Sequence, residues 1–310
     1  MDILSRVLES VRFQGWFFAD SLLSAPWSIT LPGGHLAAVH AVRAQRCWIR
    51  LLDGGEAVAF EVGDIAVLPF DRPHTVSDTP DRPGVPIDAI AGLDLSNGYL
   101  QLRYGGHGPT TRILTASCQT ISPLPRLVLH GLPTLIRLPA GQIQGVERLH
   151  ATLGLAEQEI ADVQPGIGTV LQRLAEILFI QALRATLTLS DYPHGWLRAL
   201  QDERLGPVLA ALHADPAYGW TLVELASLAH LSRSAFTDRF SKLVGTSPID
   251  YLVQWRMHLA ARLLIETDAS VAAVAHQVGY GSEPSFARLF RANFGVPPGR
   301  FRTTHRSVRT

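Results

Sequence analysis

Cysteine is scarce in this sequence of 310 residues, which contains only Cys47 and Cys118. Two cysteines are too few for a disulfide framework and are typical of a protein from a reducing compartment. Long apolar runs are missing too: none approaches the ~18 residues that a membrane-spanning helix needs, and the opening segment MDILSRVLES lacks the apolar core of a signal peptide. We therefore expect a soluble, cytoplasmic protein with no membrane partner. Each cysteine most simply packs as a small apolar side chain, with a redox-sensing thiol as the alternative.

Signatures of catalysis are absent as well. The sequence contains no Gly-x-Ser-x-Gly elbow, no phosphate-binding Walker loop and no dinucleotide fingerprint. With 47% hydrophobic and 17% charged residues, the chain can form two domains with proper cores. We expect a protein that is not an enzyme and that carries no cofactor.

A surplus of one charge sign is also missing, because 27 Lys and Arg balance 27 Asp and Glu. The balance is uneven along the chain: residues 201–310 carry 12 basic and 9 acidic side chains, whereas residues 1–200 carry 15 and 18. Six arginines and no acid follow Glu283. This concentration of positive charge is typical of a surface that lies on a phosphate backbone.

The same carboxy-terminal region contains an internal repeat. The segments HLSRSAFTDRFSKLVGTSPIDY and GYGSEPSFARLFRANFGVPPGRFR align at an offset of 50 residues. Each copy predicts a helix with a serine N-cap, two inward phenylalanines at i and i+4, a glycine C-cap and a proline that opens the next helix. The matched pairs are Ser232 and Ser282, Phe236 and Phe286, Phe240 and Phe290, Gly245 and Gly295, Pro248 and Pro298, and Tyr251 and Phe301.

A shorter apolar helix precedes each copy, at Leu222–Ala229 after the capping residue Thr221 and at Val271–Val278 after the capping residue Ser270. Two short helices joined by a tight turn, with polar side chains outside on the second, form the helix-turn-helix of major-groove readers. We therefore expect two such units, at about 221–244 and 270–294.

A connecting helix is predicted between the units, over Pro248 to Thr267. Its length of roughly 27 Å falls short of the ~34 Å between successive major-groove segments on one face of DNA. The two units could therefore enter adjacent grooves of a bent duplex.

Residues of about 200 to 305 resemble the DNA-binding domain of the AraC/XylS family of bacterial transcription regulators. The second unit carries the family pattern VGY-x-SE-x-x-F-x-R-x-F from Val278 to Phe290, followed by FG-x-x-P-x-x-(F/Y)-R from Phe294 to Arg302. The resemblance implies a sequence-specific regulator that binds promoter DNA, with activation through RNA polymerase as the favoured outcome.

Candidate DNA contacts lie on the outer face of each second helix. Asp238 is unusual there, because an acid near phosphates is unfavourable unless it accepts from a cytosine amino group. Arg288 is the candidate guanine reader and Arg291 a candidate phosphate contact. The full set is Arg233, Ser234, Thr237, Asp238, Arg239 and Lys242 in the first unit and Glu283, Ser285, Arg288 and Arg291 in the second.

The first two hundred residues contain short strands. CWIRLLDGGEAVAF predicts two strands joined at Asp53–Gly55, and VGDIAVLPFDRPHTV predicts a turn at Gly63, a buried strand to Leu68 and a loop that ends at His74. This spacing predicts a small antiparallel barrel or jelly roll. The segments APWSITLPGG, CWIRLLDGGEAV and GDIAVLPFDRPHTVSD resemble the cupin-like sensor domain of one branch of the AraC family.

Metal-dependent cupin enzymes hold an ion with a His-x-His pair, a glutamate and a later histidine. Here His40 is followed by Ala41 and Val42, and only His74 falls where the last ligand would lie, so we expect no metal site. His40, His74 and Trp48 are instead candidate effector contacts in an apolar cavity, with core packing as the alternative for Trp48 and for the neighbouring tryptophans.

Helical patterns over Gln142–Ala161 and Gly166–Thr188 join the two regions, and the second is apolar on more than one face, as in a core helix or a dimer contact. The expected fold class is α+β: residues 1–190 form a cupin-like antiparallel β-barrel with a helical dimerisation segment, and residues 200–305 form an all-α DNA-binding domain. The expected function is an effector-responsive, homodimeric transcription regulator. Its rivals are a cupin-type metalloenzyme fused to a vestigial DNA-binding domain and an architectural DNA-binding protein without an effector.

Overall fold

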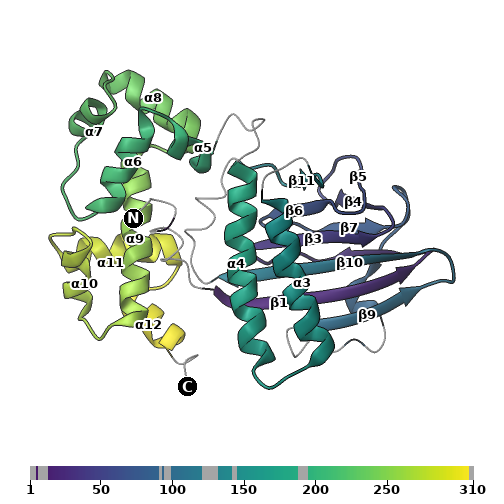
Figure 1. Cartoon of the computed structure of the whole chain (residues 1–310). Helices are drawn as coiled ribbons and strands as arrows, with labels where there is room; N and C mark the ends of the chain where they lie inside the picture. Colours follow the sequence, from purple (N-terminus) through teal and green to yellow (C-terminus); the bar gives the residue numbers. More distant parts are fainter. Residues whose placement is uncertain are drawn as a thin grey trace. The chain divides into compact units, whose positions relative to one another are not determined.

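The computed structural model describes Ser5, Leu93 and residues 13–90, 99–120, 132–141, 145–187 and 195–306. The chain divides into two compact units. The strand-rich unit contains the described residues from 13 to 187, coloured purple to teal in Figure 1, and the helical unit contains residues 195–306, coloured green to yellow. The predicted α+β class is confirmed. No helix in the described part of the chain is both long and apolar enough to cross a membrane.

A six-stranded sheet forms one layer of the strand-rich unit, in the order β11-β6-β3-β10-β1-β9. Alternation along β10 sends Thr115 and Ser117 to one face of this sheet, and this face meets the second sheet. The strands are β1 (Phe13–Ser24), β3 (Ala37–Ala44), β6 (Ile65–Pro69), β9 (Tyr99–Gly105), β10 (Thr110–Thr120) and β11 (Ile136–Leu138).

A five-stranded sheet, in the order β5-β4-β7-β2-β8, forms the opposing layer. Ile49, Phe60 and Leu68 are fully buried in the core between the sheets. The predicted strand pair around Asp53–Gly55 and the loop ending at His74 are confirmed. The elements are β2 (Ser28–Leu31), β4 (Cys47–Leu51), β5 (Val58–Phe60), β7 (His74–Ser77), β8 (Val85–Pro86) and the 3-10 turn η1 (Ile87–Ala89).

The prediction of an antiparallel barrel needs a correction. Among the described strands the sheets are two separate layers and not a closed barrel, and each contains one parallel pair, β1 with β9 and β2 with β8. Parallel neighbours arise because each pair is joined by a long connection and not by a hairpin.

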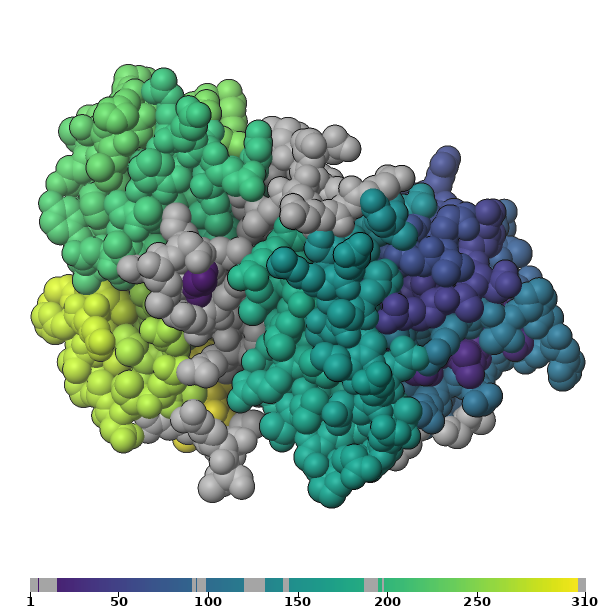
Figure 2. All heavy atoms as spheres, in the orientation of Figure 1, coloured from purple at the N-terminus to yellow at the C-terminus, as the bar shows by residue number. Residues whose placement is uncertain are grey.

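Two helices cover the outer face of the six-stranded sheet, α3 (Val146–Asp162) and α4 (Ile167–Leu187), close to the predicted ranges. In Figure 2 their atoms form a continuous teal surface. Leu171 and Leu178 of α4 are buried, and α4 contacts β1, β10 and β11. Arg112 of β10 fastens α3 to the sheet through ion pairs with Asp20 of β1 and Glu157 of α3.

The helical unit contains the two predicted helix-turn-helix pairs, joined by a helix of 19 residues that spans about 28 Å. Its first two helices, over 196–201 and 205–214, were not predicted from the sequence. The elements are α5 (Trp196–Gln201), α6 (Leu205–Ala214), α7 (Leu222–Leu228), α8 (Arg233–Val244), α9 (Pro248–Glu266), α10 (Val271–Gln277), α11 (Glu283–Phe294) and α12 (Pro298–Arg306).

Most predicted caps of the repeat are confirmed. The hydroxyls of Thr221, Ser232 and Ser270 accept hydrogen bonds from the backbone three residues on, and the C-caps Gly245 and Gly295 are left-handed, with φ of 85° and 75°. Ser282 is the exception, because it occupies the N-cap position of α11 without a side-chain hydrogen bond. The helix begins there with Pro284 in its first turn, where φ is already set for a helix.

Candidate functional site

The recognition helix of the first unit, α8, has one buried and one exposed face. Phe236 and Phe240 are fully buried, whereas Arg233 and Ser234 are exposed and Thr237 is half-buried. This is the orientation that the phenylalanine spacing predicted. Whether these outer side chains contact DNA stays a prediction.

The acid on this face has an ion-pair partner on its own helix. The Asp238 carboxylate lies 2.8 Å from Nζ of Lys242, and the two side chains are 62% and 71% exposed. An exposed pair at i and i+4 contributes little stability, so Lys242 can turn from Asp238 to a phosphate without a large loss. Asp238 and Lys242 therefore form a pair whose charges offset each other.

The Arg239 side chain is paired with an acid within the helical unit. Its guanidinium donates to both carboxylate oxygens of Asp202, at 3.4 and 2.5 Å, and Asp202 also accepts from the two amides that begin α6. Burial opposes the charge on Asp202, but the hydrogen bonds from Arg239 and from the two amides outweigh it and lower the pKa of this carboxyl. Arg239 therefore fixes α8 against the loop between α5 and α6.

The recognition helix of the second unit, α11, presents cations without counter-ions. Arg288 and Arg291 are exposed, and neither guanidinium makes an ion pair or hydrogen bond with another described residue. Glu283 is also exposed, and Ser285 is half-buried at the first turn. The second unit consequently presents the stronger positive field for a phosphate backbone.

The loop between α6 and α7 contacts both the connecting helix α9 and the turn of the second helix-turn-helix unit. Gly279, at the turn of the second unit, has φ of +89°, and a Cβ there would lie 2.6 Å from the carbonyl oxygen of Ala217. Arg256 of α9 donates to the carbonyls of Pro216 and Tyr218, at 2.6 and 2.8 Å. This clamp could not be predicted from the sequence, because its partners lie at least 38 residues apart along the chain.

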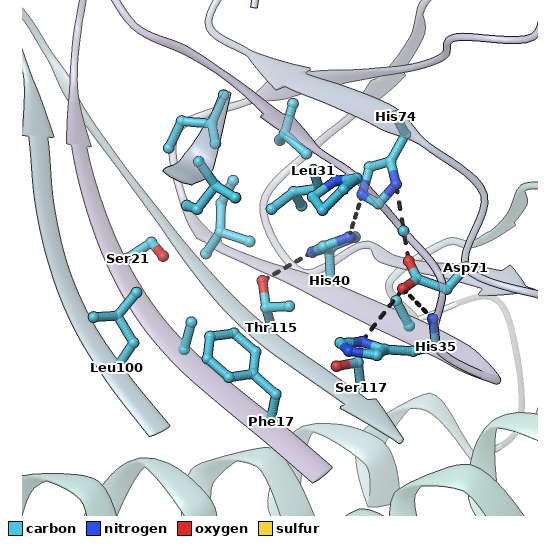
Figure 3. A pocket seen from close by; sticks show the side chains of 18 of the residues that line it. Phe17, Ser21, Leu31, His35, His40, Asp71, His74, Leu100, Thr115 and Ser117 are labelled. Carbon is cyan, nitrogen blue, oxygen red and sulfur yellow. Dashed lines mark hydrogen bonds and ion pairs between the residues drawn. The ribbon is translucent and has the colours of Figure 1, made fainter. Parts of the chain in front are cut away.

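The strand-rich unit contains a partly open cavity of about 390 Å³ between its two sheets. Figure 3 shows its polar corner, where His40, His74 and Thr115 point toward one another. The rest of the lining is mostly apolar and comes from β1, β2, β7, η1, β9 and β10, including Phe17, Leu23, Ile29, Leu31, Val76, Ile87, Leu100, Leu102 and Ile113.

His40 and His74 belong to one directed chain of hydrogen bonds. Nδ1 of His74 is 2.7 Å from the carbonyl oxygen of Arg72, which can only accept, so this nitrogen carries the proton. Nε2 of a neutral His74 then accepts from Nε2 of His40 at 2.9 Å, and Nδ1 of His40 accepts from the Thr115 hydroxyl at 2.8 Å. Burial lowers the pKa of both imidazoles, most strongly for His40, whose pKa the neighbouring His74 lowers further. Both rings are neutral near pH 7, and all four ring nitrogens are engaged.

This geometry does not resemble a metal centre. The two Nε2 atoms that a shared ion would need are hydrogen-bonded to each other. No group of three or more possible metal ligands occurs within the described ranges. His35 lies close by, with its amide 3.2 Å and its Nδ1 3.4 Å from Oδ2 of Asp71. The corner is therefore a satisfied polar network beside an apolar space.

Of the three sequence-predicted effector contacts, the structure brings two together and leaves the third outside. His40 and His74 line the cavity, but Trp48 does not, because it lies on β4 between the inward residues Cys47 and Ile49 and its ring lies 5.7 Å from the Arg46 guanidinium. Trp16 does line the cavity.

Ser117 lines the cavity and was not predicted from the sequence to do so. Its side chain is 6% exposed, and its hydroxyl oxygen is buried without a hydrogen-bond partner. The signal was present in TTRILTASCQT, where small polar residues alternate with apolar ones in a strand, but their neighbours could not be known.

Both cysteines are buried, and burial raises the pKa of each thiol to about 12. A protonated thiol without access to solvent is a poor nucleophile. This agrees with the packing role of Cys47 and Cys118 and gives no support to a redox sensor.

The strand-rich unit is a sandwich with a cavity, and the same chain carries two helix-turn-helix units whose outer faces bear exposed arginines. This combination defines a DNA-binding regulator. Residues 2–188 match the cupin family, and residues 225–304 match the helix-turn-helix domain family. The chain belongs to the AraC-like transcription regulators with an amino-terminal cupin domain.

Relatives align over nearly the whole chain. An AraC-like transcription regulator from Streptomyces antibioticus is 31% identical over 97% of this chain and 98% of its own. The HTH-type transcriptional regulator AlkR from Acinetobacter baylyi is 30% identical over 97% and 99%. The solved DNA-binding domain of AdpA, in complex with a target DNA, is 31% identical and covers 35% of this chain and 97% of its own, with a TM-score of 0.34. The predicted family and its DNA-binding regulatory function are confirmed.

Proposed function

We propose that the strand-rich unit is the sensor of this regulator and that its cavity binds a small effector that changes how the helical unit reads promoter DNA. The observation that carries the proposal is the cavity of about 390 Å³ between the two sheets. Its size and its apolar lining with a few convergent polar groups are those of small-molecule sites. In this proposal, residues 1–190 bind the effector and form the dimer, and residues 200–305 bind DNA.

The strands that line the cavity also carry the outer helices, which offers a route for the signal. Thr115 and Ser117 face the cavity from β10, while the other face of β10 and β1 contacts α4. Trp16 lines the cavity and lies beside Gly168 of α4, where a Cβ would be 3.8 Å from its ring. An effector that favours one arrangement of this wall over another would shift α4, and only such differential binding can regulate.

A homodimer would use the outer surface of α3 and α4. Val170 and Ile177 are 39% and 43% exposed on α4, and Leu155 of α3 is 53% exposed. Large apolar side chains on one surface favour a protein contact. These residues are the proposed contact between protomers.

On DNA, the proposed roles follow exposure and pairing. Arg288 reads a guanine, Arg291 contacts phosphate, and Glu283 and Ser285 lie at the start of the same helix. In the first unit, Arg233, Ser234, Thr237, Asp238 and Lys242 face the groove, while Arg239 positions α8 through Asp202.

The proposed outcome is activation through contact with RNA polymerase in the cytoplasm, where promoter DNA and polymerase are found, and not catalysis. The relatives that align along the whole chain carry the names of regulators, which supports a non-enzymatic role. Stoichiometric bound iron, zinc or manganese in the purified protein would favour the rival metalloenzyme.

The test is binding of the purified full-length protein to fragments of its own upstream region, titrated with salt and with nonspecific duplex. Tight, selective binding that falls steeply with log salt is expected. An organic-solvent extract of the producing cells should change the affinity, and Ala38→Leu, which fills the cavity, should abolish that change. Ala161→Leu, on the exposed side of α3, is the matched control. An extract effect that survives Ala38→Leu would contradict the sensor role of the cavity.

A further inference from the structure

The cavity limits the size of its occupant. At the ~30 Å³ that one water takes in the liquid, 390 Å³ holds about a dozen non-hydrogen atoms. Most of these atoms must be apolar, because apolar side chains, mainly leucine, isoleucine and alanine, form most of the wall. The occupant is therefore a small molecule with a hydrocarbon body.

The lining has no arrangement that compensates a charged group. None of the described residues that line the cavity is a lysine or an arginine, so an anion would be buried without a counter-charge. The one acid, Asp71, is 5% exposed and already accepts from the amide of His35, whose ring is 3.4 Å away. A cation would have to displace His35 to gain that carboxylate.

The two central histidines do not supply the missing recognition. All four ring nitrogens of His40 and His74 are engaged, and the Thr115 hydroxyl hydrogen is committed to His40. These hydrogen bonds fix the shape of the polar corner, but they leave neither His40 nor His74 with a ring N–H that could donate to an effector.

Of the two lining serines, Ser21 and Ser117, only Ser117 has a fully buried hydroxyl oxygen without a hydrogen-bond partner in the described part of the chain. Its hydroxyl is buried without a partner on the cavity side of β10, and in the sheet it lies between Phe17 of β1 and the small residue Ala38 of β3. A hydroxyl can both donate and accept, so it fits an alcohol, a carbonyl or an ether. A ligand group here would recover the free energy lost by burying the serine unpaired.

We propose that the effector is an uncharged molecule with a hydrocarbon body and one hydrogen-bonding group, which pairs with the hydroxyl of Ser117. This inference rests on the proposed sensor function of the cavity. It assigns Ser117, and not His40 or His74, as the residue that recognises the polar group.

Three probes with the same chain and different heads test the proposal: decanol, decanoate and decylammonium. Binding to the full-length protein is measured by titration calorimetry below the concentrations at which the probes self-associate. Decanol should bind at least about tenfold more tightly than either ion, since an unpaired buried charge costs far more than a satisfied hydroxyl. Ser117→Ala should weaken decanol roughly two- to tenfold, the net effect of one hydrogen bond. Ser21→Ala, which removes another buried lining hydroxyl, is the matched control and should leave decanol binding unchanged.

Ala38→Leu separates the inference from the sensor function, because it should abolish all binding within the cavity. If decanoate or decylammonium binds as tightly as decanol and Ala38→Leu abolishes that binding, the uncharged class is wrong while the sensor cavity stands. Equal losses in Ser21→Ala and Ser117→Ala would overturn the assignment to Ser117. Binding that Ala38→Leu leaves intact would overturn the inference and the sensor cavity together. If no probe binds up to its solubility, the inference fails, and the extract experiment alone decides the sensor function.

Discussion

Tyr251 and Phe301 occupy equivalent places in the two helix-turn-helix units. The Tyr251 ring lies 5.6 Å from that of Phe240, and the Phe301 ring lies 5.3 Å from that of Phe290. The repeat is therefore an aromatic cluster built twice. The difference is one hydroxyl: Oη of Tyr251 accepts from Nε1 of the buried Trp196 at 2.5 Å and so ties α5 to the first unit.

Replacing this hydroxyl should destabilise the helical unit without removing its packing. Tyr251→Phe leaves the indole N–H of Trp196 buried without its acceptor and removes the hydroxyl that lies 2.6 Å from Nε2 of the buried His213, which together cost ~1–3 kcal/mol of unfolding free energy. Calorimetry on the full chain would show the transition of the helical unit at a lower temperature. Tyr218→Phe is the control, because its hydroxyl donates to Glu224 from a residue that is 48% exposed, and it should leave the transition temperature nearly unchanged. Equal transitions in the two variants would mean that the bond to Trp196 contributes nothing.

Gly279→Ala should weaken both folding and DNA binding. The residue has φ of +89°, which costs an alanine roughly 1–2 kcal/mol, and its Cβ would lie 2.6 Å from the carbonyl oxygen of Ala217. Relief of this clash moves one unit against the other, so affinity for a two-groove site should fall beyond the loss of stability. Gly281→Ala, two residues on, has nothing within 4 Å of its Cβ and serves as the control. Matching DNA affinities for the two variants would refute the clamp.

The helical unit was predictable because its signals are local. Phenylalanines at i and i+4, the caps and the prolines each act within one turn, and the repeat doubled every signal. The bond of Arg239 to Asp202 was not predictable, because it joins residues 37 apart and depends on how α5 and α6 fold back.

The cavity could be predicted only in outline. His40 meets Thr115 because β3 and β10 pair in one register, and a slip of one residue would turn both side chains to the other face. For the same reason Trp48 could not be assigned to a face of its strand from the sequence. The unpaired hydroxyl of Ser117 follows from its neighbours across the sheet, which lie far away in sequence.

Arg288→Ala should reduce affinity for the operator by ~1–3 kcal/mol and relax preference at one base pair. The guanidinium is exposed without an ion-pair partner in the described part of the chain, so its loss leaves folding unchanged. Selection from a randomised operator library would reveal the relaxed position. Arg291→Ala should instead weaken all sequences alike and reduce the salt slope by about 1. If Arg288→Ala instead weakened binding to all operator sequences equally, Arg288 would be a contact to the DNA phosphate backbone and not to a base.

Arg239→Ala should give a third pattern, because its partner is Asp202 and not DNA. We expect a lower melting temperature of the helical unit and an unchanged order of preference among operator sequences. A relaxed base preference in this variant would show that Arg239 leaves Asp202 to read a base.

The strand-rich unit should lose stability as the pH falls below 6.5. Burial lowers the pKa of His40 and His74 in the folded state, although Asp71, 4.0 Å from Nδ1 of His74, favours the charged form of that ring. Below the ordinary pKa of 6.5 the unfolded chain binds protons that the folded chain does not, so stability rises with pH in this window and levels off above it. Each histidine can contribute up to ~1.4 kcal/mol per pH unit. Denaturant unfolding between about pH 5 and 8 would measure the slope. The double variant His40→Gln with His74→Gln should reduce it and leave the smaller contribution of His150, whose pKa is also lowered by burial. An equal slope in the double variant would place the proton uptake elsewhere in the chain.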